Sequence, residues 1–270
     1  MIITCDIHHQ SLGTGNQLHS NKSELDCAYD FFKYCEEMNF KMTFFFSGLA
    51  IRDDWNEKLE EITSSKLVEI GGHNWDCFSP EIVHRVCNKL FGSYNGTIDM
   101  QTKDCEKTID IIRQKTGRDI TSWRNHMYMH GPHTEKVLRN CGIKVCSDGV
   151  MRDSSGFIRK GKLLDLPINV LPDHEHLYHA ERTKEWVEKW KSRYNWSDDF
   201  GSDSYEIEEW GMFYKRSYFE KYSQGHLPVS IIHPITMYLA DNFKTIKKLL
   251  KDIVKDETYT VDEARIIYEK

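Results

Sequence analysis

Several short apolar segments of the sequence end in side chains that can do acid–base or metal chemistry. Asp6 and His8 close the first segment, Ile2–Ile7, and residues two apart on a strand share a face. Similar residues close later segments, and they are His73, Cys77, Arg124, His126, Asp165 and His233. Because catalytic residues of a barrel gather at the carboxyl ends of its strands, we expect this set to lie together at one mouth.

The chemistry of this set is that of a metal-dependent acyl hydrolase. His73 and Cys77 are four residues apart, a spacing that lets both reach one ion from a single helical turn. Zinc binds histidine, cysteine and carboxylate ligands and keeps one position open for water. The ion lowers the pKa of that water and polarises a carbonyl group, and a carboxylate base and a histidine acid would complete the hydrolysis.

A second group of histidines competes for the metal role. His174, His176 and His179 follow Asp173 within a few residues. A histidine-rich tract can bind metal, but the same residues are common in polar loops, and the sequence leaves both interpretations open. A mixed site, in which this loop supplies one ligand to the strand-end set, is a third interpretation.

Strands and helices alternate along the chain, which indicates parallel strands with crossover helices. We predict strands at 2–7, 41–46, 67–70, 122–125, 143–146, 163–168 and 228–232, and helices at 24–38, 55–62, 99–115, 134–140, 243–254 and 261–268, with further helices between 181 and 222. No glycine-rich phosphate-binding loop follows any of these strands, which argues against a nucleotide-binding fold. We therefore expect an α/β fold, a distorted (β/α) barrel in a single domain over residues 1–270.

Composition and charge narrow the class of protein. The net charge of −6 argues against wholesale binding to nucleic acid or anionic membranes, which requires a basic surface. The segment Met1–Asp6 lacks the basic leader of a signal peptide, and no apolar stretch is long enough to span a membrane. We expect a cytoplasmic protein whose eight scattered cysteines are free thiols.

Tryptophan and tyrosine are concentrated in the later part of the chain. Trp186 and Trp190 are four residues apart on a predicted helix, and Trp196 and Trp210 follow. Stacking on a sugar is one function of such residues, but core packing is the default expectation at helical spacing.

Five patches in order resemble the NodB-type polysaccharide deacetylases, carbohydrate esterase family four. They span residues 4 to 234 and are Thr4-Cys5-Asp6, Thr43-Phe44-Phe45-Phe46-Ser47-Gly48, Glu69-Ile70-Gly71-Gly72-His73 with Cys77, Trp123-Arg124, and Ile231-Ile232-His233-Pro234. The resemblance implies a general base at Asp6 and a metal ligand at His73. It also implies that Arg124 orients the base and that His233 protonates the departing amine.

The resemblance also locates the departures from the family pattern. The family's metal aspartate falls on Ile7, which cannot bind a metal, and its second metal histidine falls on Cys77. His8 takes the next position on the same face as Asp6, so the implied zinc ligands become His8, His73 and Cys77. Asp165 is a candidate hydrogen-bond partner for His233.

The function that follows is hydrolysis of an N-acetyl group, or alternatively an O-acetyl group, on a saccharide or a saccharide precursor. The substrate is then an acetylated saccharide, and the cofactor is a divalent metal, with zinc favoured. Two alternatives stay open. One is an amide hydrolase that acts on C–N bonds outside sugars. The other is a degenerate barrel that binds a saccharide or a partner without catalysis, which Ile7 and Cys77 motivate.

Overall fold

An eight-stranded sheet forms the centre of the protein. A computed structural model describes residues 1–8, 15–254 and 257–270. The strand order is β6-β7-β5-β4-β3-β2-β1-β8, and all neighbouring pairs are parallel except the antiparallel pair β6 and β7. The strands are β1 (Ile2–Ile7), β2 (Met42–Phe46), β3 (Val68–Gly72), β4 (Ser122–Trp123), β5 (Val145–Cys146), β6 (Ile158–Lys160), β7 (Leu163–Asp165) and β8 (Val229–Ile231).

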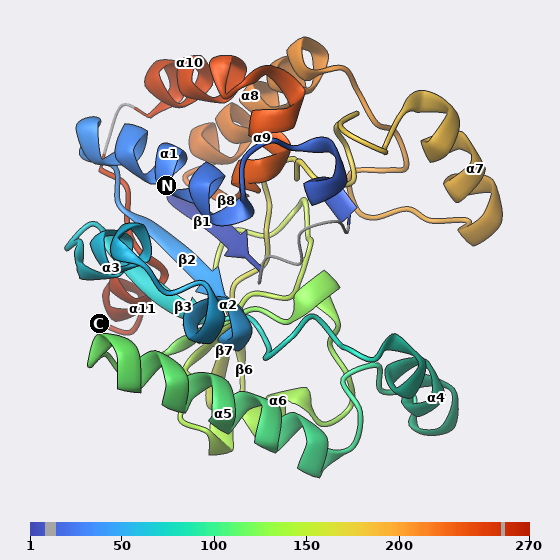
Figure 1. Ribbon diagram of the computed structural model, residues 1–270. Coiled ribbons are helices and arrows are strands. Elements are labelled where there is room, and N and C mark those ends of the chain that lie inside the picture. The colour runs from blue at the N-terminus through green and yellow to red at the C-terminus, as the bar shows by residue number, and fades with distance from the viewer. Residues whose placement is uncertain (9–14, 255–256) are drawn as a thin grey trace.

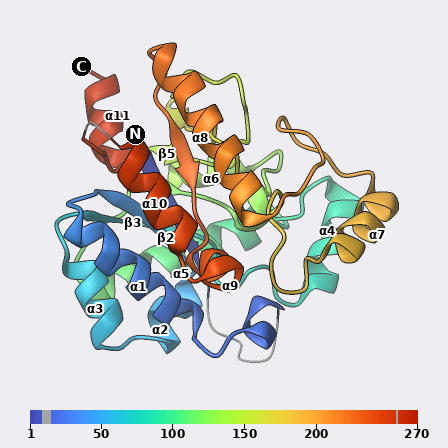
Figure 2. The same ribbon diagram turned by 90° about the horizontal axis from the view of Figure 1, so that it is seen from above.

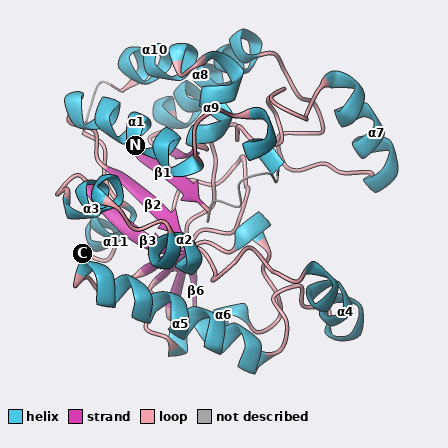
Figure 3. Ribbon diagram, in the orientation of Figure 1, coloured by secondary structure: helices cyan, strands magenta, loops and turns pink. Residues whose placement is uncertain are grey.

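Helices cover the outside of this curled sheet. Figure 1 shows α1, α8, α9 and α10 on one side and α5 and α6 on the other, and Figure 3 shows the strands enclosed between them. The helices are α1 (Glu24–Glu37), α2 (Gly48–Asp53), α3 (Glu57–Ser64), α4 (Glu81–Phe91), α5 (Ile98–Thr116), α6 (Thr134–Asn140), α7 (Lys184–Tyr194), α8 (Ile207–Ser223), α9 (Pro234–Asp241), α10 (Lys244–Ile253) and α11 (Val261–Tyr268), with short 3-10 turns η1 (Gly15–His19) and η2 (His126–Tyr128). No helix in the described residues has both the length and the apolar character needed to cross a bilayer. The expectation that most of the tryptophans are core residues holds for Trp210, which is fully buried, whereas Trp186, Trp190 and Trp196 are half-buried.

The barrel is closed by loop backbone where a strand pair would be expected. After β7 the chain returns to the far edge of the sheet, where the N–H groups of Asn169 and Val170 donate to the carbonyl of Val229 at 3.1 and 3.2 Å. The buried Asn169 side chain accepts from the N–H of Val229 at 2.8 Å and donates to the carbonyl of Leu227 at 3.0 Å. The predicted distorted (β/α) barrel is therefore confirmed, with one side of the wall made by a hydrogen-bonded loop.

Several elements were not expected from the sequence, among them α4, β6 and α9. Helix α4 buries only Cys87, so its apolar residues do not mark a core-facing stripe. Strand β6 is three residues long and half exposed, and it breaks the all-parallel pattern. Helix α9 starts at Pro234, directly after a strand, a position where proline is favoured but which the apolar run of β8 conceals.

Two glycines at the end of β3 bring the site-bearing strands together. A Cβ at Gly71 would lie 2.4 Å from the ring of Phe45, and one at Gly72 would lie 2.3 Å from the ring of Trp123. Only glycine allows rings on β2 and β4 to approach this backbone so closely. The next residue, His73, consequently enters the site at the junction of three strands.

Candidate active site and metal centre

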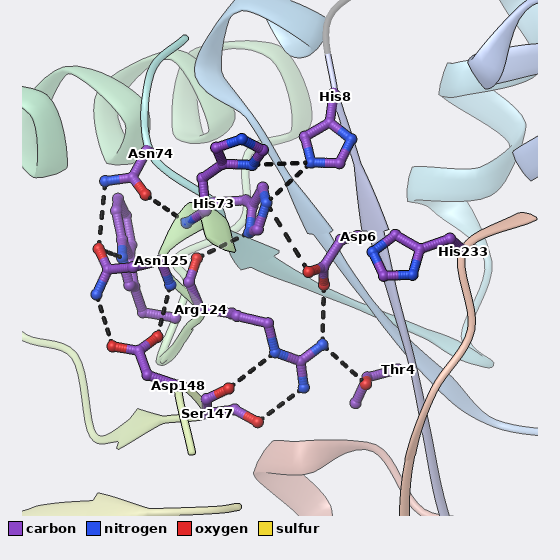
Figure 4. A network of polar contacts seen from close by, with 12 residues as sticks. Thr4, Asp6, His8, His73, Asn74, Arg124, Asn125, Ser147, Asp148 and His233 are labelled. Atoms are coloured by element: carbon purple, nitrogen blue, oxygen red, sulfur yellow. Dashed lines mark hydrogen bonds and ion pairs between the residues drawn. The ribbon is translucent and has the colours of Figure 1, made fainter. Parts of the chain in front are cut away.

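A buried ion pair at the carboxyl ends of β1 and β4 forms the floor of the site. Arg124 donates to Asp6 Oδ1 at 2.8 Å and to Thr4 Oγ1 at 3.0 Å, and its other nitrogens donate to the carbonyl and the hydroxyl of Ser147 (Figure 4). Burial disfavours the charged form of Asp6, but the Arg124 guanidinium and the nearby rings of His73, His233 and His8 together outweigh burial and hold the pKa of this carboxyl well below its usual range. Asp6 is therefore a carboxylate across the physiological pH range.

Three imidazoles converge above this pair, and we call His8, His73 and His126 the imidazole triad. His8 Nε2 lies 3.1 Å from His73 Nε2 and 3.2 Å from His126 Nδ1, and the three nitrogens lie within 4.8 Å of one another. Zinc–nitrogen bonds of about 2.0–2.1 Å place two cis ligand nitrogens roughly 3 Å apart, so the spacing fits a common ion. His73 Nε2 is also 3.8 Å from Asp6 Oδ2, which brings the triad next to the ion pair.

The far nitrogens of two triad rings fix where their protons lie. His8 Nδ1 is 2.7 Å from Glu24 Oε1, and His73 Nδ1 is 2.8 Å from the carbonyl of Arg124. Both partners are acceptors, so both Nδ1 atoms carry the proton and both Nε2 atoms present lone pairs to each other. A proton or a metal ion must lie between such atoms, and the donor chemistry therefore fits a metal.

The pKa values of two triad rings agree with this arrangement. Burial lowers the pKa of His73 to about 4 and that of His126 well below its ordinary value, so both rings are neutral, as metal ligands must be. For His8, burial is outweighed by Glu24, and its pKa is raised. Carboxylate partners of this kind orient metal-binding histidines.

His233, two residues after the end of β8, favours the protonated and charged form of its ring, whereas Asp6 favours the deprotonated form. Its Nδ1 lies 2.7 Å from Asp173 Oδ1, and its backbone N–H donates to Asp173 Oδ2 at 2.6 Å. Burial opposes protonation, but Asp173 outweighs it and raises the pKa of His233 to about 9. The expectation that Asp165 would pair with His233 is wrong, because Asp165 pairs with Lys160 at 2.8 Å.

The structure places His126, and not Cys77, beside His8 and His73. The expected helical turn from His73 to Cys77 is wrong, because the segment is a loop in which Asn74 and Cys77 have φ values of 56° and 59°. Within the described residues, Cys77 belongs to no group of three clustered donor atoms. Burial raises the pKa of its thiol well above the usual value, which also opposes the thiolate form that metals bind.

The loop histidines 174, 176 and 179 do not gather around one point. His176 is paired with Asp198 at 3.0 Å and with the carbonyl of Asp203 at 2.6 Å, and His179 Nδ1 donates to the carbonyl of Leu177 at 2.9 Å. In the described part of the chain these residues form no donor cluster. His174 alone approaches the site, with its ring 5.2 Å from that of His233.

A second group of donors lies behind Arg124. His130, Cys146 and Asp148 also place their donor atoms within 4.8 Å of one another. The Asp148 carboxylate accepts from the N–H and the side chain of Asn125, at 2.6 and 2.7 Å, and from His130 at 2.9 Å. Protein donors already engage both of its oxygens, so we assign this group to positioning Asn125, the residue between Arg124 and His126.

Sequence reasoning missed two contributors to the site, Asp173 and Glu24, and it placed a third, His126, at the barrel mouth without making it a metal ligand. His126 stands two residues after Arg124, and that spacing is the signal that could have identified it. Asp173 was grouped with the loop histidines, where nothing in the sequence connects it to His233, 60 residues away. Glu24 lies in the first turn of α1 and has no local signal for its contact with His8.

Comparison with known proteins bears on the fold. No family model matches the sequence, and no curated protein matches it. Among solved structures, a protein from Mycobacterium smegmatis classed as a polysaccharide deacetylase is 15% identical with a TM-score of 0.67, covering 99% of this chain and 89% of that chain. Puue allantoinase is 12% identical with a TM-score of 0.62, covering 96% and 86%.

A third similar structure is a pseudoenzyme of carbohydrate esterase family four from Bacillus anthracis. It is 12% identical with a TM-score of 0.50, and the match covers 97% of this chain and 64% of that chain. Identities this low are informative about the fold alone. The three proteins differ in what they do, so the chemistry of this chain must be argued from its own residues.

Proposed function

We propose that this chain, which has the NodB-type polysaccharide deacetylase fold, is a metal-dependent hydrolase that removes an N-acetyl group from a saccharide. One observation carries the proposal. A carboxylate with a lowered pKa, Asp6, lies beside a histidine with a raised pKa, His233, and next to three converging imidazoles (Figure 4). Groups whose environments push their pKa values apart are the acid and base of an acid–base pair.

The metal would be held by His8, His73 and His126, and we propose zinc because three neutral imidazoles suit it. When bound, the ion would lower the pKa of a water molecule and polarise the acyl oxygen. The chain keeps these three ligands in place from the ends of β1, β3 and β4, with Glu24 and the carbonyl of Arg124 orienting two of the rings.

Asp6 acts as the general base in this proposal. Its Oδ1 is held by Arg124, while Oδ2 faces the triad, 3.8 Å from His73 Nε2. The proton of the attacking water moves to this carboxylate, and the buried guanidinium keeps the carboxylate fixed and ionised. The cost of burying two charges is offset because they are paired and further hydrogen-bonded through Thr4 and Ser147.

His233 acts as the general acid. A pKa of about 9 keeps its ring protonated at neutral pH, with Nδ1 engaged by Asp173 and Nε2 available to give a proton. An amine leaves an amide only when its nitrogen is protonated, whereas an alcohol leaves an ester more readily. A strongly protonated acid therefore favours an N-acetyl over an O-acetyl substrate.

Two alternatives have specific support. Ile7, which is 1% exposed, stands where the resemblance implies a metal aspartate, and a similar structure is a pseudoenzyme, so a barrel that binds a saccharide without hydrolysis is the first. Puue allantoinase has a similar fold, so an amide hydrolase acting outside sugars is the second.

The decisive test measures acetate release from acetylated oligosaccharides by the zinc-loaded protein and its Asp6→Asn variant. Loss of the base should reduce the rate by about 10²–10⁴-fold, while zinc content and the circular dichroism spectrum stay unchanged. If the variant loses its fold, His233→Gln tests the same chemistry from the acid side. A wild-type protein that binds zinc but releases no acetate supports the binding barrel. Release of amine from small non-sugar amides alone supports the second alternative.

A further inference from the structure

The loop between β3 and α4 follows an unusual backbone path beside the triad. Asn74, Cys77 and Phe78 have φ values of 56°, 59° and 66°. This left-handed conformation is tolerated by asparagine but disfavoured for cysteine and phenylalanine, so it persists only where surrounding contacts impose it. The contacts that impose it lie outside the loop.

Helices α2 and α5 hold the start of this loop from two sides. Asp104 of α5 accepts from the N–H of Trp75 at Oδ1 and from the side chain of Asn74 at Oδ2, both at 3.0 Å. The N–H groups of Gly48 and Leu49 in α2 donate to the carbonyls of Asn74 and Trp75, both at 2.9 Å. The two helices pack against each other, and Figures 1 and 2 show them side by side. The loop is therefore fixed to the outer helices as well as to the sheet.

The Asn74 side chain connects this loop to the segment that carries the third imidazole. Its Oδ1 accepts from the backbone N–H of His126 at 2.8 Å, and its Nδ2 also donates to Asn125 Oδ1 at 3.2 Å (Figure 4). Asn74 is only 5% exposed, so water does not compete for these bonds. One buried amide thus sets where His126 lies relative to His73.

Polar contacts, and not close packing, hold the loop in this place. A cavity of about 270 Å³ lies beside it, and the residues around the cavity include Asn74, Trp75, Phe78, Asp104 and Asn125. A close-packed interior would resist a shift of the loop, whereas a cavity leaves room for one.

Cys77 is a competing ligand near the triad. Burial raises the pKa of its thiol, and the carboxylates of Glu24 and Asp6 raise it further, so the thiol lies in their neighbourhood. A bound metal ion deprotonates a coordinating thiol, and thiolate is a good zinc ligand. The path of the loop therefore decides which side chain reaches the metal.

We propose that Asn74 and Asp104 are positioning residues that make His126, and not Cys77, the third metal ligand. This inference rests on the metal centre of the proposed function. Asp104 keeps the loop in the path that holds Cys77 away, and Asn74 brings His126 toward His73. The chain would then replace a ligand that the resemblance places at position 77 with one from the end of the next strand, β4.

The test uses cobalt(II) in place of zinc, because a thiolate ligand adds an intense charge-transfer band in the near ultraviolet and imidazoles do not. Wild-type protein should lack this band. Asn74→Ala should bind zinc about 10–100-fold more weakly and should gain the band in its cobalt form. The band should disappear again in Asn74→Ala/Cys77→Ser. Glu106→Gln is the matched control, since Glu106 is exposed on α5, two residues from Asp104.

A second variant covers the case in which Asn74→Ala does not fold. Asp104→Asn keeps the size of the side chain but faces the Asn74 amide or the Trp75 N–H with a second donor, so it should weaken zinc binding and produce the same band. The circular dichroism spectrum shows whether each variant is folded.

The remaining outcomes separate this inference from the proposed function. Zinc affinity unchanged in both folded variants would overturn the inference, and so would weaker binding without the band, because the contacts would then not choose between ligands. A thiolate band in the wild type, together with acetate release, would overturn it and leave the hydrolase in place. A wild type that binds cobalt without the band and releases no acetate would reject only the hydrolase. A wild type that binds no metal would overturn both.

Discussion

The described residues include two groups of three histidines, and only one of them brings three ring nitrogens close together. In the imidazole triad, the nitrogens of His8, His73 and His126 face one another. In the loop at 174–179, His176 has both ring nitrogens engaged by separate acceptors, and His179 bonds its own loop backbone. The number of histidines is equal, so the difference lies in what holds the far side of each ring.

Strand geometry accounts for this difference. The triad residues follow β1, β3 and β4, which are parallel strands of one sheet with β2 between β1 and β3, so their rings project from the same edge of the sheet toward one mouth. Partners from behind, Glu24 and the carbonyl of Arg124, leave the front nitrogens free. The loop histidines follow no such set of parallel strands, and His176 and His179 donate to separate acceptors within their own part of the chain. A histidine-rich sequence is therefore a weaker indicator of metal binding than histidines at the carboxyl ends of parallel strands in one sheet.

The difference between the triad and the loop histidines should have its largest effect on the metal content of variants. Purified without a histidine tag and soaked with zinc, the wild-type protein should hold about one zinc per chain, and His73→Ala should hold almost none, because two imidazoles bind zinc much more weakly than three. His176→Ala should keep the metal while it loses about 1–3 kcal/mol of folding stability, since Asp198 loses its histidine partner and keeps only the N–H of Phe200. Elemental analysis and thermal unfolding measure both quantities.

The opposite metal contents would exchange the roles of the triad and the loop histidines. If His73→Ala retained zinc and His176→Ala lost it, the loop would be the metal centre. Loss of zinc in both variants would indicate a mixed site with ligands from each group.

A smaller effect is expected from the residue that orients His8. Glu24→Gln replaces the carboxylate that holds His8 Nδ1 at 2.7 Å, and loss of such a partner typically weakens metal affinity about 10–100-fold. Competition with a zinc chelator measures the change. Glu37→Gln, an exposed position at the end of the same helix, is the control and should leave the affinity unchanged. Equal affinities for the two variants would show that backbone placement alone orients His8.

Much of the strand arrangement was predictable from the sequence because it depends on local patterns. The apolar segments that end at Asp6, His73, Arg124 and His233 indicated strands, and a parallel arrangement requires their ends to meet. The ligand set was only partly predictable. The four-residue spacing of His73 and Cys77 suggested a helical turn, but Asn74 and Cys77 adopt positive φ values and direct the chain into a loop.

Contacts over long sequence separations were not predictable. Asp173 and His233 are 60 residues apart, and Glu24 reaches His8 only because α1 begins beside the end of β1. Neither contact follows from periodicity or spacing. The exposed apolar residues of α4 were missed for a related reason, because a pattern search assumes that apolar residues face a core.

Asp173 links the two regions and gives the last prediction. It belongs in sequence to the histidine loop, yet both of its carboxylate oxygens bind His233. Asp173→Asn keeps the shape of this contact and removes its charge, so the pKa of His233 should fall from about 9 toward the ordinary value of about 6.5. Because the acid works in its protonated form, activity in the wild type should decline only as the pH rises through about 9.

The variant should therefore lose activity at a lower pH, with the alkaline limb of its kcat profile displaced by about 2.5 pH units. The loss at pH 7 is about fourfold and grows steadily with pH, whereas a merely structural role for Asp173 would lower kcat equally at all pH values. Zinc content should not change, since the triad does not include His233. A uniform loss across the pH range would mean that Asp173 supports the loop rather than the acid, and the assignment of His233 as proton donor would lose its physical basis.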